Sequence, residues 1–163
     1  MNSTHLHLII THLPIFGSVL GALVLGYGVW GKSNQTKSAA YLIFIISAFG
    51  AGIAYLTGEG AEETAENIPG ISENIIGLHE DFALYALISL IVLGVVSLIS
   101  LIVIYKRSLI AKYAPIAILF LSLVSFTLVV RTGYLGGQIR HTEISSAGVQ
   151  NDGSSDSGEQ DND

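Results

Sequence analysis

Four long apolar segments without a single charged residue constrain this chain more than any other feature. They cover roughly residues 13–31, 39–57, 82–105 and 113–130. A hydrocarbon core about 30 Å thick takes about 20 apolar residues to cross as helix, so each segment is long enough to span a bilayer. The segments are continuous and do not alternate every second residue, which excludes barrel strands. We therefore predict an all-α fold, an integral membrane four-helix bundle.

The charged residues are sorted by these segments. All 13 carboxylates and all five histidines fall before the first segment, between the second and third, or after the fourth. The two short loops that remain carry Lys32, Lys37, Lys106, Arg107 and Lys112. The positive-inside rule makes those loops cytoplasmic, so we expect both termini to be extracytoplasmic. The expected location is the bacterial cytoplasmic (inner) membrane, as a multi-pass protein.

Composition divides the chain into two parts. Residues 1–144 are expected to form the domain with four transmembrane helices, and the first segment is expected to be retained because no secretory signal pattern precedes it. Residues 145–163 are almost entirely polar or acidic and predict a disordered acidic C-terminal tail. The absence of a basic face argues against nucleic acid as a partner. The absence of cysteine leaves histidine and carboxylate as the metal ligands and excludes c-type haem attachment.

Some helices are expected to extend beyond the apolar segments. The second helix can continue through Gly58 and Gly60, and the third is expected to begin near Glu73 after Ser72 as N-cap. The fourth can continue from residue 132 to Arg140. Small residues that let helices approach closely in lipid also recur along the first two helices. These are Gly17, Gly21, Gly26, Gly28, Gly50 and Gly52.

Histidines from three helices are expected to share one extracytoplasmic layer. With a rise of about 1.5 Å per residue from each cytoplasmic helix end, His7, His79 and His141 reach about 35–43 Å. His12 and Arg131 lie together at the outer membrane boundary, about 27–28 Å from that end. Each histidine alone is explained by a polar contact at a boundary. Their convergence from three helices predicts a ligand cluster.

Carboxylates and glycines adjoin this layer. A stripe on the second helix contains Glu59, Glu62, Glu63 and Glu66, and a solvated helix face is one explanation for it. On the fourth helix two glycines and a histidine recur every four residues, at positions 133, 137 and 141. That spacing fits either a groove for a flat macrocycle beside its axial ligand or close packing against a neighbouring helix.

Arg131 stands alone near the hydrocarbon edge, where a guanidinium is costly unless it is paired or reaches the interface. It can meet Glu59 or Glu63 as a structural ion pair. Alternatively it holds an anionic group such as a haem propionate.

Several motifs resemble those of a known family. The segment His7-Leu-Ile-Ile-Thr-His12-Leu-Pro14-Ile resembles the opening His-Pro-x-x-Val-His-Phe-Pro-Ile motif of a functionally uncharacterised family of small bacterial four-helix membrane proteins. Leu56-Thr57-Gly58, His79-Glu80 and Gly136-Gly137-Gln-Ile-Arg-His141 follow in the same order. Leu8 replaces the family's proline. The resemblance implies a membrane domain with a haem or metal role over residues 5–143.

The leading functional prediction is a membrane haem-binding, b-type cytochrome-like electron-transfer subunit. Bis-histidine ligation of haem b needs imidazoles from separate helices and cationic groups for the propionates. The candidate axial pairs are His7 or His12 with His79 or His141. The candidate propionate partners are Arg131 and Arg140.

Two other classes remain open. One is a transition-metal site for transport, sensing or hydrolysis, since imidazole and carboxylate suit first-row metals. Its candidate ligands are His7, His12, His79, His141, Glu59, Glu63 and Glu80. The other is a structural membrane subunit with no cofactor. No catalytic motif favours an enzyme.

The expected partners are the lipid bilayer, a redox partner or larger membrane complex, and further copies of the chain. The acidic outer face has two explanations: it attracts a basic partner, or it is only solvated.

Overall fold

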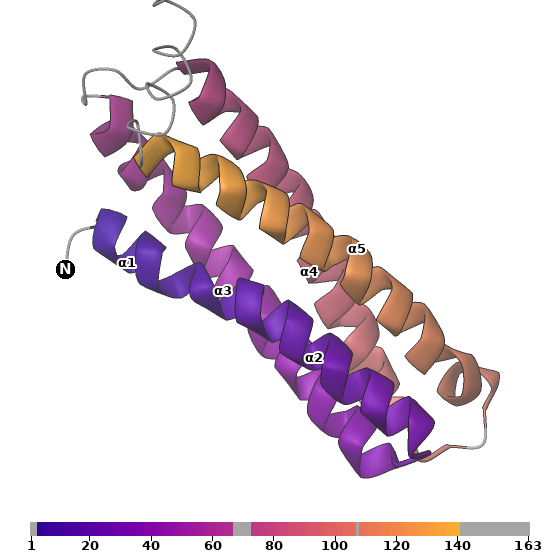
Figure 1. Cartoon of the computed structure of the whole chain (residues 1–163). Coiled ribbons are helices and arrows are strands. Elements are labelled where there is room, and N and C mark those ends of the chain that lie inside the picture. Colours follow the sequence, from indigo (N-terminus) through magenta and orange to yellow (C-terminus); the bar gives the residue numbers. More distant parts are fainter. Residues whose placement is uncertain (1–2, 67–72, 107, 141–163) are drawn as a thin grey trace, which may run out of the picture.

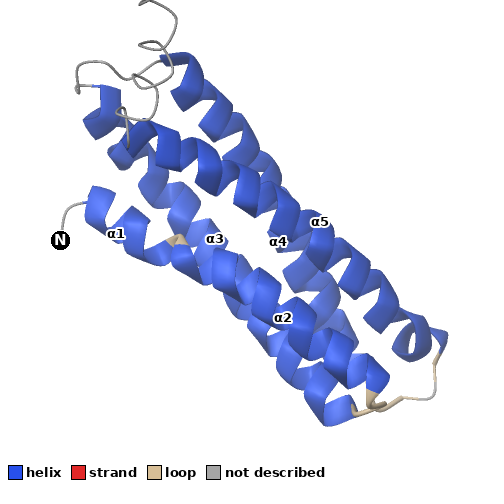
Figure 2. Cartoon of the chain, in the orientation of Figure 1, coloured by secondary structure: helices blue, strands red, loops and turns tan. Residues whose placement is uncertain are grey.

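The computed structural model describes residues 3–66, 73–106 and 108–140, apart from the side chains at 3–4, 61–66 and 140. The described residues form five helices (Figure 1 and Figure 2). Their bounds are α1 Ser3–Ile10, α2 His12–Trp30, α3 Asn34–Glu66, α4 Glu73–Val103 and α5 Leu109–Arg140. The first two are parts of one bent span, so the bundle has four spans as predicted.

The spans pack as a ring in which each helix contacts its neighbours in sequence. α2 packs on α3, α3 on α4 and α4 on α5, and α5 closes the ring against α2 (Figure 1). α3 and α5 therefore lie on a diagonal and barely meet. Because successive spans run in opposite directions, His7 and His79 lie at one end, called the histidine end, and Lys32 and Lys112 lie at the other, called the lysine end.

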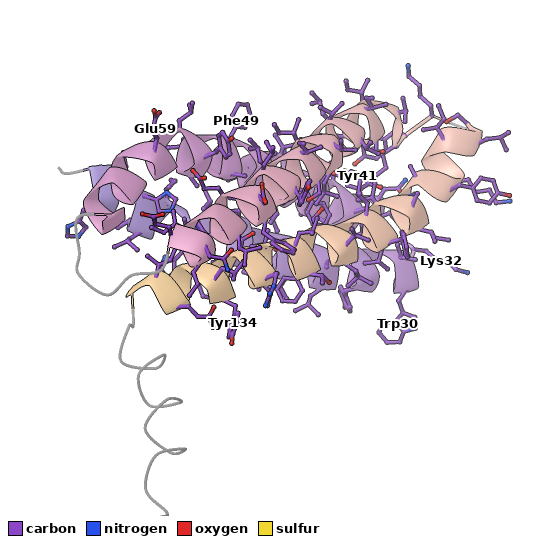
Figure 3. The ribbon with its side chains drawn as sticks, turned by 90° about the horizontal axis from the view of Figure 1, so that it is seen from above. Trp30, Lys32, Tyr41, Phe49, Glu59 and Tyr134 are labelled. Carbon is purple, nitrogen blue, oxygen red and sulfur yellow. The ribbon has the colours of Figure 1, made fainter. Side chains whose placement is uncertain are left out.

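The distribution of apolar side chains is that of a protein in lipid. Four helices are long and apolar enough to cross a bilayer, which makes the chain a multi-pass membrane protein, as predicted. Large apolar side chains cover the outside; Trp30 is 82% and Phe49 72% exposed, and both point away from the bundle in Figure 3. Tyr41 is only 1% exposed and lies inside. In water such an apolar surface would aggregate, whereas lipid covers it.

The interior contains hydroxyl groups as well as apolar side chains. Every buried polar side chain among the described residues is a serine. Ser18, Ser47 and Ser122 each donate to a carbonyl of their own helix, three or four residues earlier. In these three serines the local bond satisfies the hydroxyl without a partner helix, whereas the buried hydroxyls of Ser97, Ser100 and Ser125 have no hydrogen-bond partner among the described residues.

Close packing of α2 against α3 depends on two glycines. Gly17 lies against Ser47, and Gly21 lies against the ring of Phe44. A Cβ atom at either glycine would overlap these side chains. The predicted Gly17 and Gly21 pair therefore does lie in a helix contact, where small residues permit close van der Waals packing in lipid.

The other four predicted packing glycines divide into two groups. A Cβ atom at Gly28 would lie 2.9 Å from the backbone nitrogen of Lys37, and one at Gly50 would lie 2.8 Å from the side chain of Leu13. At Gly26 and Gly52 the added atom would meet nothing within 4 Å. The prediction that Gly26 and Gly52 serve close packing is wrong, because both face away from neighbouring helices.

The predicted helix extensions are confirmed for the described residues. α3 continues past Gly58 to Glu66, α4 begins at Glu73, and α5 continues to Arg140. These extensions build the histidine end beyond the apolar segments. The predicted N-cap Ser72 and the predicted disordered tail, residues 145–163, lie outside the described residues.

Serine caps begin two helices at the lysine end. The Ser33 hydroxyl accepts a hydrogen bond from the backbone N–H of Thr36 at 3.2 Å, and the Ser108 hydroxyl accepts one from Ala111 at 3.1 Å. Each cap satisfies an N–H group that has no carbonyl partner in the first helical turn. The caps thus define where α3 and α5 begin.

The first span is interrupted at Thr11, between α1 and α2. Pro14 has no N–H group for the carbonyl of Ile10, so the regular hydrogen-bond ladder cannot pass through this point. The Thr11 hydroxyl donates to the carbonyl of Leu8 at 3.0 Å. The interruption lets α1 take its own direction, and α1 packs on α3.

We predict that Gly28→Ala destabilises the bundle more than Gly26→Ala does. The added methyl at Gly28 collides with backbone of α3, which cannot move aside as a flexible side chain can. Overpacking of this kind costs about 1–3 kcal/mol. Thermal unfolding in detergent micelles measures the difference, and equal melting temperatures for the two variants would contradict the packing described.

Candidate cofactor site at the histidine end

His7 lies on α1 and contacts α3. Its Nδ1 atom is 2.8 Å from the carbonyl oxygen of Ala54, and the Thr57 hydroxyl is 3.4 Å from the same nitrogen. The imidazole is partly buried. The packing of α1 on α3 thus presents His7 to the backbone of another helix.

His79 lies on α4 and makes the equivalent contact to α5. Its Nδ1 atom is 3.0 Å from the carbonyl oxygen of Thr132, and this imidazole is also partly buried. The contact exists because α4 begins at Glu73, well before its apolar segment, and because α5 continues past Arg131. Both helix extensions are needed to form it.

The two contacts fix which nitrogen of each imidazole carries hydrogen. A carbonyl oxygen only accepts hydrogen bonds, so Nδ1 of His7 and Nδ1 of His79 must donate. In the neutral ring Nε2 then has a free lone pair. Metal-bound histidines usually have this arrangement, in which the non-ligating nitrogen donates to a carbonyl or carboxylate and orients the ring.

The same local geometry holds both imidazoles. Each accepting carbonyl belongs to the residue four positions before a glycine, Ala54 before Gly58 and Thr132 before Gly136. Helical carbonyls point along the axis toward residue i+4, so the incoming ring packs beside that residue. A Cβ atom at Gly136 would lie only 3.1 Å from His79 Cε1 and would crowd the ring, whereas one at Gly58 would lie 3.6 Å from His7 Cε1, an ordinary contact distance.

The two imidazoles occupy one region of the bundle. They lie within electrostatic range of each other, although His7 belongs to the α1/α3 pair and His79 to the α4/α5 pair. The exposed carboxylate of Glu80 acts on His79 as well. Two imidazoles supplied by separate helices therefore lie in one region, and each is oriented by a hydrogen bond from Nδ1 to a backbone carbonyl.

A strip of α5 beside this region is open. A Cβ atom at Gly137 would meet nothing within 4 Å, and one at Gly133 would meet only the Ile15 side chain, at 3.9 Å. α1 lies apart from α5 at this end in Figure 1. Of the two explanations for this spacing, the structure therefore favours an open strip over close packing with another helix.

His12 does not join the pair. It is exposed, its Nδ1 atom is 2.8 Å from the carbonyl oxygen of Leu8 on its own span, and its ring stacks on Phe16 with centroids 6.1 Å apart. It lines a groove on the outer surface between the first span and α3. Five positions along a helix turn a side chain by about 140°, so His7 and His12 point in different directions.

Arg131 contacts aromatic rings. Its guanidinium carbon is 5.5 Å from the ring centroid of Phe82 and 5.6 Å from that of Tyr134, and the residue is exposed. Cation–π contacts of this kind stabilise a cation at a partly dry surface. The predicted ion pair of Arg131 with Glu59 or Glu63 stays a prediction, because the side chain of Glu63 lies outside the described residues.

The remaining predicted ligand residues are either exposed at the surface or lie outside the residues that the structure describes. Glu59 and Glu80 are exposed. The side chains of Glu63 and Arg140, and all of His141, lie outside what the structure describes. Among the described residues, no three histidine or carboxylate side chains gather as a metal site. The larger metal-ligand set therefore stays a prediction.

Sequence reasoning from charge and depth missed the acceptors and the glycines of the site. Helical carbonyls have no sequence signature, so Ala54 and Thr132 could not be singled out. Gly58 and Gly136 do carry a signal, because both belong to the motifs that resemble the bacterial family.

Comparisons of the chain with models of known protein families, with curated proteins and with solved structures gave no match.

We predict that Gly136→Ala displaces the imidazole of His79, whereas Gly137→Ala does not. The new methyl group lies 3.1 Å from Cε1 of His79 in the first case and meets nothing within 4 Å in the second. Loss of the bond to Thr132 costs about 1 kcal/mol. Nitrogen-15 NMR of labelled histidine reports the Nδ1 hydrogen bond directly, and an unchanged His79 signal in Gly136→Ala would contradict the described contact.

Proposed function

We propose that this chain is a membrane haem-binding electron-transfer subunit of the b-type cytochrome kind, with His7 and His79 as the axial ligands. The observation that supports this proposal is the matched anchoring of two imidazoles on separate helices. Each donates its Nδ1 hydrogen to a backbone carbonyl, and each keeps Nε2 free. The resemblance to the bacterial four-helix membrane family agrees with the proposal.

The residues around the pair fit a flat macrocycle. Gly136 admits the His79 imidazole against α5, and among the described residues only Ile15 approaches the strip of α5 at Gly133 and Gly137. The chain has no cysteine, so attachment rests on axial ligation and packing alone, as in haem b. The donor set and the open space thus suit the same group.

The protein's own residues orient and tune such a centre. Haem supplies reversible one-electron transfer when it is bound. The carbonyls of Ala54 and Thr132 hold both rings in fixed orientations and raise their basicity through the Nδ1 hydrogen bonds. Arg131, steadied by two aromatic rings, keeps N–H donors for a propionate, and Arg140 is a second candidate for that role.

We also propose that the histidine end faces the extracytoplasmic side of a bacterial inner membrane, with both termini there. Support comes from the positive charges of the two loops at the lysine end. In this orientation the exposed carboxylates Glu59, Glu73, Glu80 and Asp81 belong to the same extracytoplasmic end as His7 and His79. Their field attracts a basic soluble redox partner.

The axial pair is tested by the absorption spectrum of the purified protein loaded with haem b. We expect a Soret band that sharpens and shifts on reduction with dithionite. His7→Ala and His79→Ala each remove a ligand and should reduce haem occupancy at least tenfold, whereas the matched control His12→Ala should retain it. A colourless wild-type protein after loading, or full occupancy in both ligand variants, would overturn the proposal.

The orientation is tested by single-cysteine labelling, for which the natural chain is already free of cysteine. Gln35→Cys probes the start of α3 at the lysine end, and Asn74→Cys probes the start of α4; both positions are exposed. We expect a membrane-impermeant maleimide to label Asn74→Cys in intact spheroplasts and Gln35→Cys only after lysis. The reverse pattern would place the histidine end in the cytoplasm.

A further inference from the structure

Three polar side chains form a row on the outer face of α5, called the donor row. They are Arg131, Tyr134 and Gln138, and their spacing of three and four residues places them on one side of the helix. Arg131 and Tyr134 are exposed, and Tyr134 points away from the bundle in Figure 3. The donor row therefore faces the surroundings of the bundle.

The donor row presents hydrogen-bond donors that the protein does not use. The guanidinium of Arg131 has five N–H groups and no acceptor, and among the side chains that the structure describes none forms a hydrogen bond or ion pair with it. Nε2 of Gln138 donates to the hydroxyl oxygen of Tyr134 at 3.1 Å, so the hydroxyl hydrogen of Tyr134 remains to be donated. A matching ligand is an anion with several acceptor oxygens.

The donor row lies at the boundary of the hydrocarbon. Residues 113–130, between Lys112 and Arg131, carry no charge and extend about 28 Å as helix, close to the hydrocarbon thickness of about 30 Å. At each end of this stretch a cation lies over an aromatic ring, Lys112 over Tyr113 at 5.1 Å and Arg131 over Phe82 at 5.5 Å. Aromatic side chains concentrate where acyl chains meet headgroups. The phosphates of the lipid headgroups are therefore the anions that a bilayer brings to the level of Arg131.

Aromatic rings hold the guanidinium in place. Its carbon lies 5.5 Å from the ring centroid of Phe82 on α4 and 5.6 Å from that of Tyr134 on α5. The exposed ring of Tyr85, one turn farther along α4, packs edge-on against Phe82 with centroids 6.2 Å apart. A cation that is oriented before its ligand arrives loses less entropy on binding. Arg131 thus differs from a cation that extends freely into the headgroups.

We propose that the donor row binds the phosphate group of a glycerophospholipid in the leaflet at the histidine end. Arg131 donates two parallel hydrogen bonds to the phosphate oxygens, and the Tyr134 hydroxyl donates a third. The acyl chains pass over the exposed side of Phe82 and Tyr85 toward the membrane interior. Two of the five guanidinium N–H groups suffice for the phosphate, so the site does not depend on a haem and does not exclude the propionate contact proposed above.

The phosphate contact is tested by solid-state NMR of the full chain in bilayers. The chain has three arginines, so Arg107→Lys combined with Arg140→Lys leaves Arg131 as the only arginine. Its Cζ atom is labelled with carbon-13, the bilayers contain phosphatidylglycerol and phosphatidylethanolamine, and the buffer contains no phosphate. We expect the lipid phosphorus to dephase most of the Cζ signal through direct carbon–phosphorus coupling. Absence of dephasing would overturn the proposal.

A matched position separates this site from the general attraction of arginine to headgroups. Leu56 is 80% exposed on α3 and lies as many residues beyond Lys37 as Arg131 lies beyond Lys112. Leu56→Arg, in a chain whose three natural arginines are replaced by lysine, places a single arginine at the same depth without the ring of Phe82. We expect little dephasing there, because a freely moving side chain averages the coupling. Equal dephasing at the two positions would overturn the site.

The source of the phosphate is tested in glycolipid bilayers to which inorganic phosphate is added. We expect no dephasing of the Arg131 signal, because free phosphate brings no acyl chains to the rings of Phe82 and Tyr85. Dephasing as strong as in phospholipid would identify a site for free phosphate and overturn the lipid.

The hydrogen bond from Tyr134 is tested by titrating phosphatidylglycerol and counting bound lipid by native mass spectrometry. Tyr134→Phe removes one donor and should raise the dissociation constant about fivefold. The matched control Tyr55→Phe changes an exposed tyrosine of α3 and should leave the constant unchanged. Equal constants for the two variants would overturn the role of Tyr134.

Discussion

The close approach of α2 and α3 is the contact on which the rest of the structure depends. In lipid no hydrophobic force brings helices together, so their distance is set by how closely the backbones can pack. Gly17 and Gly21 admit Ser47 and Phe44 of α3 directly against α2. Because α1 continues from α2, this packing also delivers His7 to the Ala54 carbonyl farther along α3. Interior contacts near the middle of the membrane thus determine the position of an imidazole at its edge.

The anchoring of the two histidines shows how a helical backbone can hold a side chain from another helix. Carbonyls inside a helix already accept one hydrogen bond, yet their second lone pair remains available. At Gly136, four residues after Thr132, the missing side chain lets the ring of His79 approach closely, whereas at Gly58 a Cβ atom would make only an ordinary contact with His7. No charged side chain is needed, which suits a site at the margin of hydrocarbon, where ionic partners are costly.

Much of the architecture could be predicted from sequence, because hydrocarbon imposes long uncharged helices and a strict sorting of charge. The spans, the extension of α3, α4 and α5, and the common level of His7 and His79 all follow from counting residues along helices. Rotation about a helix axis was harder to predict. His12 is exposed and donates a hydrogen bond within its own span, and Arg131 lies over the rings of Phe82 and Tyr134. Such directions depend on neighbours that the sequence does not place.

The division of the two imidazoles between separate helix pairs has a mechanical consequence. His7 is held between α1 and α3, and His79 between α4 and α5, so the relative position of the two rings depends on how α3 packs on α4. At that seam Gly94 lies against Ala48. A larger side chain at Gly94, remote from either ring, would therefore alter how the two imidazoles sit relative to each other.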